Sequence, residues 1–537
     1  MQTGPNNLIS ILEHAACFHG NVEVVSCVSE TVSPLRTNYR TIFGRANQLA
    51  HALDSLGLNP GDRVATLAWN THRHLEAWYA IAGQGLVCHT VNPRLPRQHL
   101  QFIMEHAEDR VVMVDADLMP TLVDLLSDLP RLEHVVVLSA EPQSAPIGHS
   151  VQWHVYEDWI APWPEAFAWP ELEADAPSGL CYTSGTTGQP RGVLYTHRSN
   201  LHHAGAVNES GALGMSSSDC VLMVVPMFHA NSWGIAYSAP MAGAKLVLPG
   251  RNLDAMSLCN LLSDERVTFG AAVPAIWSRV LERLVERNQR LPDLREVISG
   301  GSAVPATMIE TFREHFGVNV LHAWGMTEMS PMGTMCRLKH HMFGWSKERQ
   351  VRQLAKQGLP PFGLQLRIVN DAGEPMPHNG RSMGHVQTKG PWVIDRYFKE
   401  DQPCVDTDGW FSTGDVGTID TEGFLEITDR SKDLVKSGGE WISSVQLETV
   451  AMGCPGVHCA AVIAVPDEHW QERPLMLIEE TSHGAADIDE VRSRILDAFP
   501  KWWLPKNIGI VGEIPLTSIG KIDKKALRAK WNSDAKS

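Results

Sequence analysis

The sequence predicts an α/β protein with two domains: a large N-terminal domain of mainly parallel sheets covered by helices, and a small α+β C-terminal domain. Helical and strand-like patterns alternate along most of the chain, which is typical of parallel sheets covered by helices. A chain of 537 residues is too long for a single hydrophobic core. A dense run of charges at residues 429–433 precedes a segment with its own helix and strand pattern. We therefore expect domains at residues 1–430 and 434–537, joined by a hinge at 431–433.

The alternation can be followed from element to element. Apolar residues recur at helical spacing over residues 41–56, and a turn at 59–62 leads into a strand at 63–68. The pattern continues with a helix near residues 74–83, a strand near 87–91, a helix near 98–106 and a strand at 111–114. Later elements are strands at 246–248, 269–273, 296–299 and 320–322, then a helix at 444–452 and a strand at 460–465. The Pro- and Ala-rich stretch at 140–170 indicates a surface loop.

Composition and charge narrow the class of function. The formal net charge of −16 argues against a nucleic-acid partner, since phosphate attraction needs a basic face. The ten cysteines lack the paired spacing of a zinc site, so we expect most of them to be buried thiols. The sequence has neither a signal-peptide pattern nor a run of 18 apolar residues. These features predict a cytoplasmic protein without integral membrane contact.

Residues 182–193, Tyr-Thr-Ser-Gly-Thr-Thr-Gly-Gln-Pro-Arg-Gly-Val, predict a phosphate-binding loop. Gly185 and Gly188 can adopt positive φ and bring N–H groups close to an anion, and Arg191 adds a positive charge. Further donors are the hydroxyl groups of Thr183, Ser184, Thr186 and Thr187. The loop is not a Walker A loop, and the apolar residues after it favour a strand, so it is expected to join two strands. A Ser- and Gly-rich surface turn is the alternative for the loop considered alone.

Together with the motifs described next, this loop resembles the phosphate loop of the adenylate-forming superfamily, which includes acyl-CoA synthetases, luciferases and peptide-synthetase adenylation domains. The resemblance covers nearly the whole chain. It implies ATP, Mg²⁺ and coenzyme A as cofactors and a mobile C-terminal domain. The family usually has Lys where this sequence has Arg191. The guanidinium of Arg is planar and can donate two parallel hydrogen bonds, whereas the ammonium of Lys is a compact single charge. We expect the function to survive that change.

The acyl pocket is expected around residues 225–233, Val-Pro-Met-Phe-His-Ala-Asn-Ser-Trp. A histidine among apolar residues is usually a satisfied core residue. The resemblance implies instead that His229 lies beside the acid and the phosphates and orients the carboxylate, as a catalytic residue. Trp233, one helical turn later, would then form a wall of the acyl pocket. Gly301 and Met332 are further residues that we expect to contact the acid.

The nucleotide base is expected to lie against two segments, residues 301–303 and residues 324–327, that each follow a strand. Glycine at the first segment permits close approach of a flat ligand, with a plain turn as the alternative. In the second segment the indole of Trp324 can stack on adenine, although the family more commonly has Tyr there. The residues concerned are Gly301, Ser302, Ala303, Trp324, Gly325, Met326 and Thr327.

Metal and ribose contacts are assigned from the same resemblance. Glu328 is the expected magnesium ligand, with Thr186, because Mg²⁺ completes its octahedron with phosphate oxygens and water and needs few protein carboxylates. Asp415 matches the carboxylate that accepts hydrogen bonds from the ribose hydroxyls, and Arg430 matches the ribose-contacting arginine. A surface turn capped by Asp is the alternative for the motif around Asp415.

The C-terminal motifs imply a second, rotated arrangement of the domains. Lys432 occupies the hinge position. Lys521, which follows Gly520 between two isoleucines, matches the family's catalytic lysine, which enters the active site as negative charge builds at phosphorus. The pantetheine tunnel of CoA is expected along Lys436, Ser437, Gly438, Gly439, Glu440 and Trp441. An ordinary Gly-Gly hairpin is the alternative for this segment.

The motifs occur in the family's order, which implies an acid-thiol ligase. It would activate a short- or medium-chain carboxylate as acyl-AMP and pass the acyl group to CoA, as a homodimer. The motifs around His229, Glu328 and Trp441 resemble those of bacterial 3-methylmercaptopropionate-CoA ligases, which act in dimethylsulfoniopropionate breakdown. The alternatives are a medium-chain fatty acyl-CoA synthetase and an adenylating module that passes acyl-AMP to a carrier protein.

Overall fold

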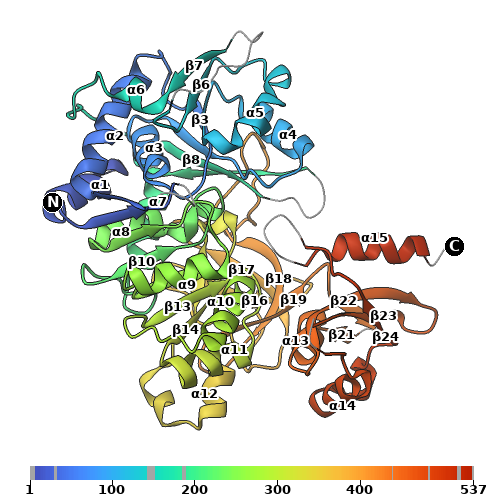
Figure 1. Ribbon diagram of the computed structural model, residues 1–537. Coiled ribbons are helices and arrows are strands. Elements are labelled where there is room, and N and C mark those ends of the chain that lie inside the picture. The colour runs from blue at the N-terminus through green and yellow to red at the C-terminus, as the bar shows by residue number, and fades with distance from the viewer. Residues whose placement is uncertain are drawn as a thin grey trace.

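The computed structural model of the chain (Figure 1) describes residues 6–28, 33–141, 151–183, 189–437, 440–481, 484–516 and 522–534. Its strands form four sheets, of which two are large and mostly parallel. The predicted fold class, a large N-terminal part of parallel sheets and helices with a smaller C-terminal part, is confirmed. Among the described residues no helix is long and apolar enough to cross a membrane.

The first large sheet lies in the upper part of Figure 1 and carries the phosphate-loop segment. Its strands, in spatial order, are β7 (Gln152–Val155), β6 (His134–Val137), β5 (Val111–Val114), β3 (Arg63–Leu67), β4 (Val87–Thr90), β8 (Pro177–Tyr182) and β9 (Gly192–Thr196). All neighbours are parallel except β8 and β9, which are antiparallel. The phosphate-loop segment therefore joins two strands, as the sequence predicted.

The second large sheet continues the parallel arrangement. Its strands, in spatial order, are β15 (Met332–Met335), β14 (Asn319–Gly325), β13 (Glu296–Gly300), β12 (Phe269–Ala272), β10 (Cys220–Met223), β11 (Lys245–Leu248), β1 (Glu23–Ser26) and β2 (Leu35–Asn38). Only the two edge strands, β15 and β2, pair in antiparallel fashion. The four later strands that the sequence predicted are β11, β12, β13 and β14.

Helices cover the two large sheets and close their cores. Amphipathic periodicity predicted the second, third and fourth of these helices within a few residues of their observed ends. The helices are α1 (Ile9–Phe18), α2 (Tyr39–Asp54), α3 (His72–Gly83), α4 (Arg97–Ala107), α5 (Met119–Val123), α6 (Tyr156–Ile160), α7 (His197–Val207), α8 (Ile235–Ala242), α9 (Ala255–Asp264), α10 (Pro274–Glu286), α11 (Ala306–Thr311) and α12 (Lys347–Leu354). The most extensive buried cluster joins residues of α1, α2, α3 and α8 to both sheets.

Two smaller sheets complete the fold. An antiparallel sheet of β16 (Gln365–Val369), β17 (Gly384–Lys389), β18 (Phe411–Ile419) and β19 (Leu425–Arg430) was not predicted from the sequence. The C-terminal sheet contains β20 (Val435–Ser437), β21 (Glu440–Ile442), β22 (Val457–Asp467), β23 (Gln471–Glu480) and β24 (Asn507–Val511). Its helices are α13 (Ser444–Met452), α14 (Ile488–Ala498) and α15 (Lys524–Asp534).

The stretch at 140–170 is more ordered than the predicted surface loop. Its described part contains β7, which adds a parallel strand to the sheet, and the short helix α6. Glu157 on α6 pairs with Arg45 at 2.9 Å and with Arg73 at 2.7 Å. Arg45 also pairs with the fully buried Glu76 at 2.8 Å. This ionic cluster, contributed by residues far apart in the sequence, holds the segment against α2 and α3.

The C-terminal part is attached to β19 by buried polar contacts. Asp429 accepts hydrogen bonds of 2.5 Å from both the N–H and the hydroxyl of Ser444, the first residue of α13. On α15, Lys524 donates to Glu448 at 2.7 Å and to the Ser444 hydroxyl at 2.6 Å. Arg528, one turn later, pairs with Asp433. These contacts fix α15 beside the segment where the hinge was predicted.

Candidate active site

The predicted site residues gather where parallel strands end. Thr183 follows β8, His229 follows β10 after a short loop, and Gly301 follows β13. Trp324 is the penultimate residue of β14, and Glu328 lies just beyond this strand. The carboxyl ends of the strands in an open α/β sheet are the usual place for a ligand. Sheet topology therefore explains why segments more than a hundred residues apart in the sequence contribute to one region.

The base of the phosphate-loop segment is closed by backbone pairing. The N–H of Thr183 donates to the carbonyl of Arg191 at 2.9 Å, and the N–H of Arg191 donates to the Thr183 hydroxyl at 3.4 Å. The tip of the loop, with the predicted ligands Ser184, Gly185, Thr186, Thr187 and Gly188, lies outside the described residues. Their proposed phosphate and metal contacts stay predictions.

Glu328, the expected magnesium ligand, is a buried carboxyl with one tyrosine partner. Its side chain is buried, and one carboxylate oxygen accepts a hydrogen bond of 2.9 Å from the hydroxyl of Tyr397. Burial raises the pKa of the Glu328 carboxyl, against the lowering effect of the Tyr397 hydroxyl and of Arg430 and Arg191. No cluster of three or more metal-ligating side chains occurs among the described residues. A single buried carboxylate fits Mg²⁺, which takes most of its ligands from phosphate and water.

The two predicted ribose residues and Trp324, from the predicted adenine site, form one hydrogen-bonded group. Asp415 is 4% exposed and faces Arg430 across the β18–β19 pair. Its two carboxylate oxygens accept from Arg430 Nε at 2.9 Å and from Trp324 Nε1 at 2.8 Å. The indole of Trp324 thus has a polar role that the sequence did not indicate. Stacking of Trp324 on adenine stays a prediction.

The backbone conformation and close packing of the fold also require glycine at two positions of the predicted adenine segments. Gly301 has a φ of +85°, which favours glycine. A Cβ on Gly325 would lie 1.9 Å from the carbonyl oxygen of Pro331, and this carbonyl also accepts from the N–H of Met326. Thr327 is buried, and its carbonyl accepts from the Tyr195 hydroxyl at 2.8 Å. Close backbone packing therefore accounts for Gly325 without a ligand. Ser302 is exposed and Ala303 half-buried at the end of β13.

His229 lies next to the phosphate-loop strand. It lines a cavity of about 20 Å³ together with Tyr182, which directly precedes Thr183. The remaining lining residues are Thr90, Asn92, Leu95, Ile103 and Phe228. His229 is half-buried. The structure therefore brings the predicted catalytic histidine and the base of the phosphate loop to one place.

The turn after His229 differs from the predicted helical turn. Residues 230–234 all have positive φ, between 44° and 77°, so the turn is left-handed. Such a conformation costs roughly 1–2 kcal/mol for each non-glycine residue. Two buried hydrogen bonds hold it: Asn231 donates to Asn200 at 3.1 Å, and Ser232 donates to the Val225 carbonyl at 3.1 Å. Trp233 is consequently half-buried against the main core cluster.

Met332 is fixed by two residues that the sequence did not indicate. Its N–H donates to His203 Nε2 at 3.1 Å, and its carbonyl accepts from Trp392 Nε1 at 3.0 Å. Burial lowers the pKa of His203 to about 3, so this imidazole is neutral and can accept at Nε2. A Cβ on Gly234 would lie 2.4 Å from the His203 ring. The residue after Trp233 and the backbone of Met332 therefore contact the same buried histidine.

The described C-terminal site residues lie in a turn and in a hairpin. Lys432 lies in the turn between β19 and β20, and burial lowers its pKa. Lys436 and Ser437 pair with Trp441 and Glu440 in an antiparallel hairpin. The Trp441 ring contacts His385 on β17 at 5.6 Å between ring centroids. Gly438, Gly439 and Lys521 lie outside the described residues. Trp441 of the predicted CoA segment thus packs against β17 of the small antiparallel sheet.

Comparisons with known proteins agree with this geometry. The AMP-binding enzyme family matches residues 12–398, and the AMP-binding enzyme C-terminal domain matches residues 446–521. A medium-chain-fatty-acid–CoA ligase of Ectopseudomonas oleovorans is 44% identical, over 97% of this chain and 95% of the relative. A 3-methylmercaptopropionyl-CoA ligase of Ruegeria lacuscaerulensis is 42% identical, over 99% of this chain and 98% of the relative.

The fold of the whole chain also matches the solved structure of a CoA ligase. The crystal structure of the anthranilate CoA ligase AuaEII in complex with anthranoyl-AMP aligns with a TM-score of 0.87 at 25% identity, covering 99% of this chain and 98% of that chain. The chain therefore belongs to the AMP-binding enzymes of the adenylate-forming superfamily. Within this superfamily it is an acyl-CoA ligase, for which ATP and CoA are substrates.

Proposed function

We propose that the enzyme converts 3-methylmercaptopropionate to its acyl-adenylate and then to its CoA thioester, as a step in dimethylsulfoniopropionate breakdown. The observation that supports the nucleotide site most directly is a pair of buried carboxylates, Asp415 on β18 and Glu328 just beyond β14. Asp415 is oriented by Trp324 and Arg430, and Glu328 is buried beside Tyr397. One carboxylate suits the ribose hydroxyls and the other a magnesium ion.

The proposed roles follow from the chemistry of each side chain. Asp415 would accept hydrogen bonds from the ribose, while Arg191 and the N–H groups of the phosphate loop would contact the β- and γ-phosphates. Glu328, with Thr186, would hold Mg²⁺, which supplies charge neutralisation at the polyphosphate. His229 would orient the carboxylate toward the α-phosphate. Catalysis would then rest on positioning and charge stabilisation.

Domain movement is part of the proposal. We place the two domains at residues 1–430 and 434–537, with the hinge at 431–433. Adenylation would use Lys521 from the C-terminal domain. Rotation about Lys432 would then bring the segment from Lys436 to Trp441 to the acyl-adenylate for attack by the CoA thiol.

The acid can be identified by a competition experiment. The two relatives described above act, by name, on medium-chain fatty acids and on 3-methylmercaptopropionate, and their identities of 44% and 42% do not separate the two substrates. Thioester formation should be measured with equimolar mixtures of short, medium, branched and sulfur-containing acids. We expect 3-methylmercaptopropionate to have the highest kcat/KM. A maximum at octanoate would favour the medium-chain alternative, and no thioester with any acid would favour the carrier-loading alternative.

Replacement of Trp233 with alanine is expected to shift the preference toward longer acids, because an indole that forms the wall of the acyl pocket limits its length. The φ of 54° at this position is equally unfavourable for both side chains, so the backbone preference is unchanged. The measurement is kcat/KM for straight-chain acids from butyrate to laurate. Trp233→Phe should give an intermediate profile. An unchanged profile in both variants would remove Trp233 from the acyl pocket.

Replacement of Trp324 with phenylalanine is expected to raise the KM for ATP about tenfold, with little change in kcat. A tenfold change in KM is the scale of one hydrogen bond to a charged group. The variant keeps an aromatic face for adenine but loses the donor that orients Asp415. The KM for CoA should stay unchanged. Trp470, 55% exposed in the C-terminal part, provides the control variant Trp470→Phe. An unchanged KM for ATP would show that the indole N–H does not support the ribose site.

A further inference from the structure

The side chain of Arg191 is held in one orientation by two residues of a distant loop. Its Nε donates to Glu400 Oε1 at 2.9 Å and its Nη2 to Glu400 Oε2 at 2.7 Å. The guanidinium carbon lies 3.5 Å from the ring centroid of Tyr397. Among the described residues, no hydrogen bond of Nη1 is found, so this end of the fork is available for a ligand.

The exposure of this ion pair indicates a role other than stability. The side chains of Arg191 and Glu400 are 47% and 39% exposed. Exposed ion pairs contribute little to folding stability, because solvent screens them and because two long side chains lose conformational freedom. A bidentate pair stacked on an aromatic ring does, however, fix the plane of a guanidinium. The geometry therefore favours orientation of Arg191 over stabilisation of the fold.

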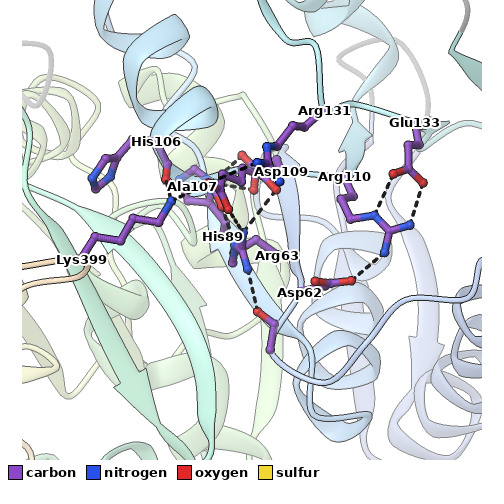
Figure 2. A network of polar contacts seen from close by, with 12 residues as sticks. Asp62, Arg63, His89, His106, Ala107, Asp109, Arg110, Arg131, Glu133 and Lys399 are labelled. Atoms are coloured by element: carbon purple, nitrogen blue, oxygen red, sulfur yellow. Dashed lines mark hydrogen bonds and ion pairs between the residues drawn. The ribbon is translucent and has the colours of Figure 1, made fainter.

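The loop that carries Tyr397 and Glu400 is itself anchored to the N-terminal sheet. The N–H of Phe398 donates to the Gly192 carbonyl at 2.8 Å, next to Arg191. Lys399 donates to the His106 carbonyl at 2.9 Å and pairs with Glu108 at 3.1 Å. Figure 2 shows Lys399 extending toward the end of α4 beside His106. Glu400 is consequently presented by a fixed loop.

Tyr397 connects this arrangement to the proposed metal carboxylate. Its ring lies under the Arg191 guanidinium, and its hydroxyl donates to Glu328 Oε1 at 2.9 Å. In addition, the N–H of Ile394 donates to the Glu328 carbonyl at 3.0 Å. One segment, residues 394–400, thus contacts both the cation of the phosphate loop and Glu328.

We propose that Glu400 and Tyr397 are positioning residues for the polyphosphate of ATP: Glu400 directs the free Nη1 edge of Arg191 at the phosphates, and Tyr397 sets the distance between Arg191 and Glu328. This inference rests on the proposed function of the nucleotide site. It also accounts for Arg at a position where the superfamily resemblance leads one to expect Lys. A lysine ammonium can neither form the bidentate pair with Glu400 and keep a second edge for phosphate, nor stack its charge flat on Tyr397.

Pyrophosphate binding, measured by calorimetry in saturating Mg²⁺, tests the role of Glu400. Glu400→Ala is expected to weaken binding about tenfold, and Arg191→Lys at least as much, although the lysine keeps the charge. In the Arg191→Ala background, Glu400→Ala should have no further effect, because Glu400 acts through Arg191. Glu171→Gln, at an exposed position, is the control. Tighter binding by Glu400→Ala would show that Glu400 competes with phosphate, and would overturn the proposal.

The magnesium dependence of pyrophosphate binding tests the role of Tyr397. Tyr397→Phe keeps the ring under Arg191 but removes the hydroxyl at Glu328. We expect its affinity without Mg²⁺ to equal that of the wild type, and the gain in affinity on adding Mg²⁺ to be about tenfold smaller. Tyr397→Leu should weaken binding under both conditions. Tyr79→Phe, which removes a buried hydroxyl bonded to the Ala236 carbonyl, is the control for loss of a tyrosine hydroxyl.

The outcomes separate this inference from the proposed function. If wild-type enzyme binds pyrophosphate with Mg²⁺ and the Glu400 and Tyr397 variants bind it equally well, the positioning roles are wrong and the nucleotide site stands. If the wild type itself binds neither pyrophosphate nor ATP, the proposed site is wrong. Variants that lower the melting temperature without changing these dissociation constants would assign Glu400 and Tyr397 to the fold alone.

Discussion

Replacement of Lys521 with alanine is expected to slow pyrophosphate release from acid and MgATP by about 10² to 10³-fold, the scale for one lost donor at developing negative charge. The lysine lies between Leu516 and Ile522, which form a β-bridge, and α15 begins shortly afterwards. Lys521 itself lies outside the described residues. Because the lysine acts on charge that develops in the transition state, the dissociation constant for ATP should change little.

The matched control for Lys521 is Lys525→Ala, an exposed lysine four residues along the chain on α15. Single-turnover kinetics with acid and MgATP measure adenylation directly, and synthetic acyl-adenylate with CoA measures thioester formation by itself. Lys521→Ala should retain wild-type thioester formation from the adenylate. Pyrophosphate release at the wild-type rate would exclude Lys521 from the adenylation step.

Replacement of Lys524 with methionine is expected to lower the free energy of unfolding of the C-terminal part by about 3–5 kcal/mol at alkaline pH, the usual cost of removing one partner of a buried ion pair. Lys524 is 11% exposed and bonds Glu448 and Ser444. Burial lowers its pKa, but the charges of Glu448 and Asp429 outweigh this effect and raise the pKa above the ordinary value. Without Lys524, the buried carboxylate of Glu448 would lose its counter-charge.

The cost of losing Lys524 should depend on pH. Burial raises the pKa of Glu448 to about 7, against the lowering effect of Lys524, and burial also raises the pKa of the nearby Asp429. A carboxyl of this kind has a higher pKa in the folded protein than in the unfolded chain. Its contribution to folding stability is complete below the unfolded pKa and is lost as the pH rises through the folded pKa. Without Lys524 the folded pKa of Glu448 rises further. The variant should therefore be nearly as stable as the wild type near pH 5 and much less stable near pH 8.

Urea unfolding at several pH values, followed by limited proteolysis of the C-terminal part, measures this effect. The double variant Lys524→Met, Glu448→Gln is the matched control, because it removes both charges and should lose the pH dependence. A destabilisation that is equal at both pH values would show that lost packing of the lysine chain, and not an uncompensated carboxylate, is the cause.

Local patterns in the sequence were sufficient for the fold class and for some of its helices and strands. Helical spacing predicted α2, α3, α4 and α13, and runs of apolar residues predicted the central parallel strands. The antiparallel sheet of β16 to β19 was missed. Its strands lack the runs of apolar residues that indicate a strand, and they pair with segments that are distant in the sequence. The order of residues 151–160 was missed for a similar reason: Glu157 is held by Arg45 and Arg73, which the sequence does not place nearby.

The candidate site was predicted only in part. The composition of the phosphate loop indicated Thr183, and the resemblance of short motifs to those of the superfamily indicated His229, Glu328 and Asp415. The residues that contact Arg191, Glu328 and Met332 were not found from the sequence. Tyr397, Glu400, His203 and Trp392 act through contacts with residues far along the chain, and a lone Tyr, Glu, His or Trp carries no local signal. The polar partner of Trp324 was missed in the same way, since Asp415 is 91 residues distant.

The handedness of the turn after His229 could not be predicted from the sequence either. A spacing of four residues between His229 and Trp233 predicts a right-handed turn by default. The observed left-handed turn depends on hydrogen bonds of Asn231 and Ser232 to buried partners and on the contact of Gly234 with His203. Tertiary contacts therefore decided the local conformation at the proposed acyl pocket.

The most direct test of the proposed reaction is a mass-spectrometric measurement of products from 3-methylmercaptopropionate, MgATP and CoA. We expect acyl-CoA and AMP in equal amounts, with acyl-adenylate bound to the enzyme when CoA is left out. AMP release that does not depend on CoA, or acyl-adenylate that persists when CoA is present without any thioester, would contradict the proposed reaction.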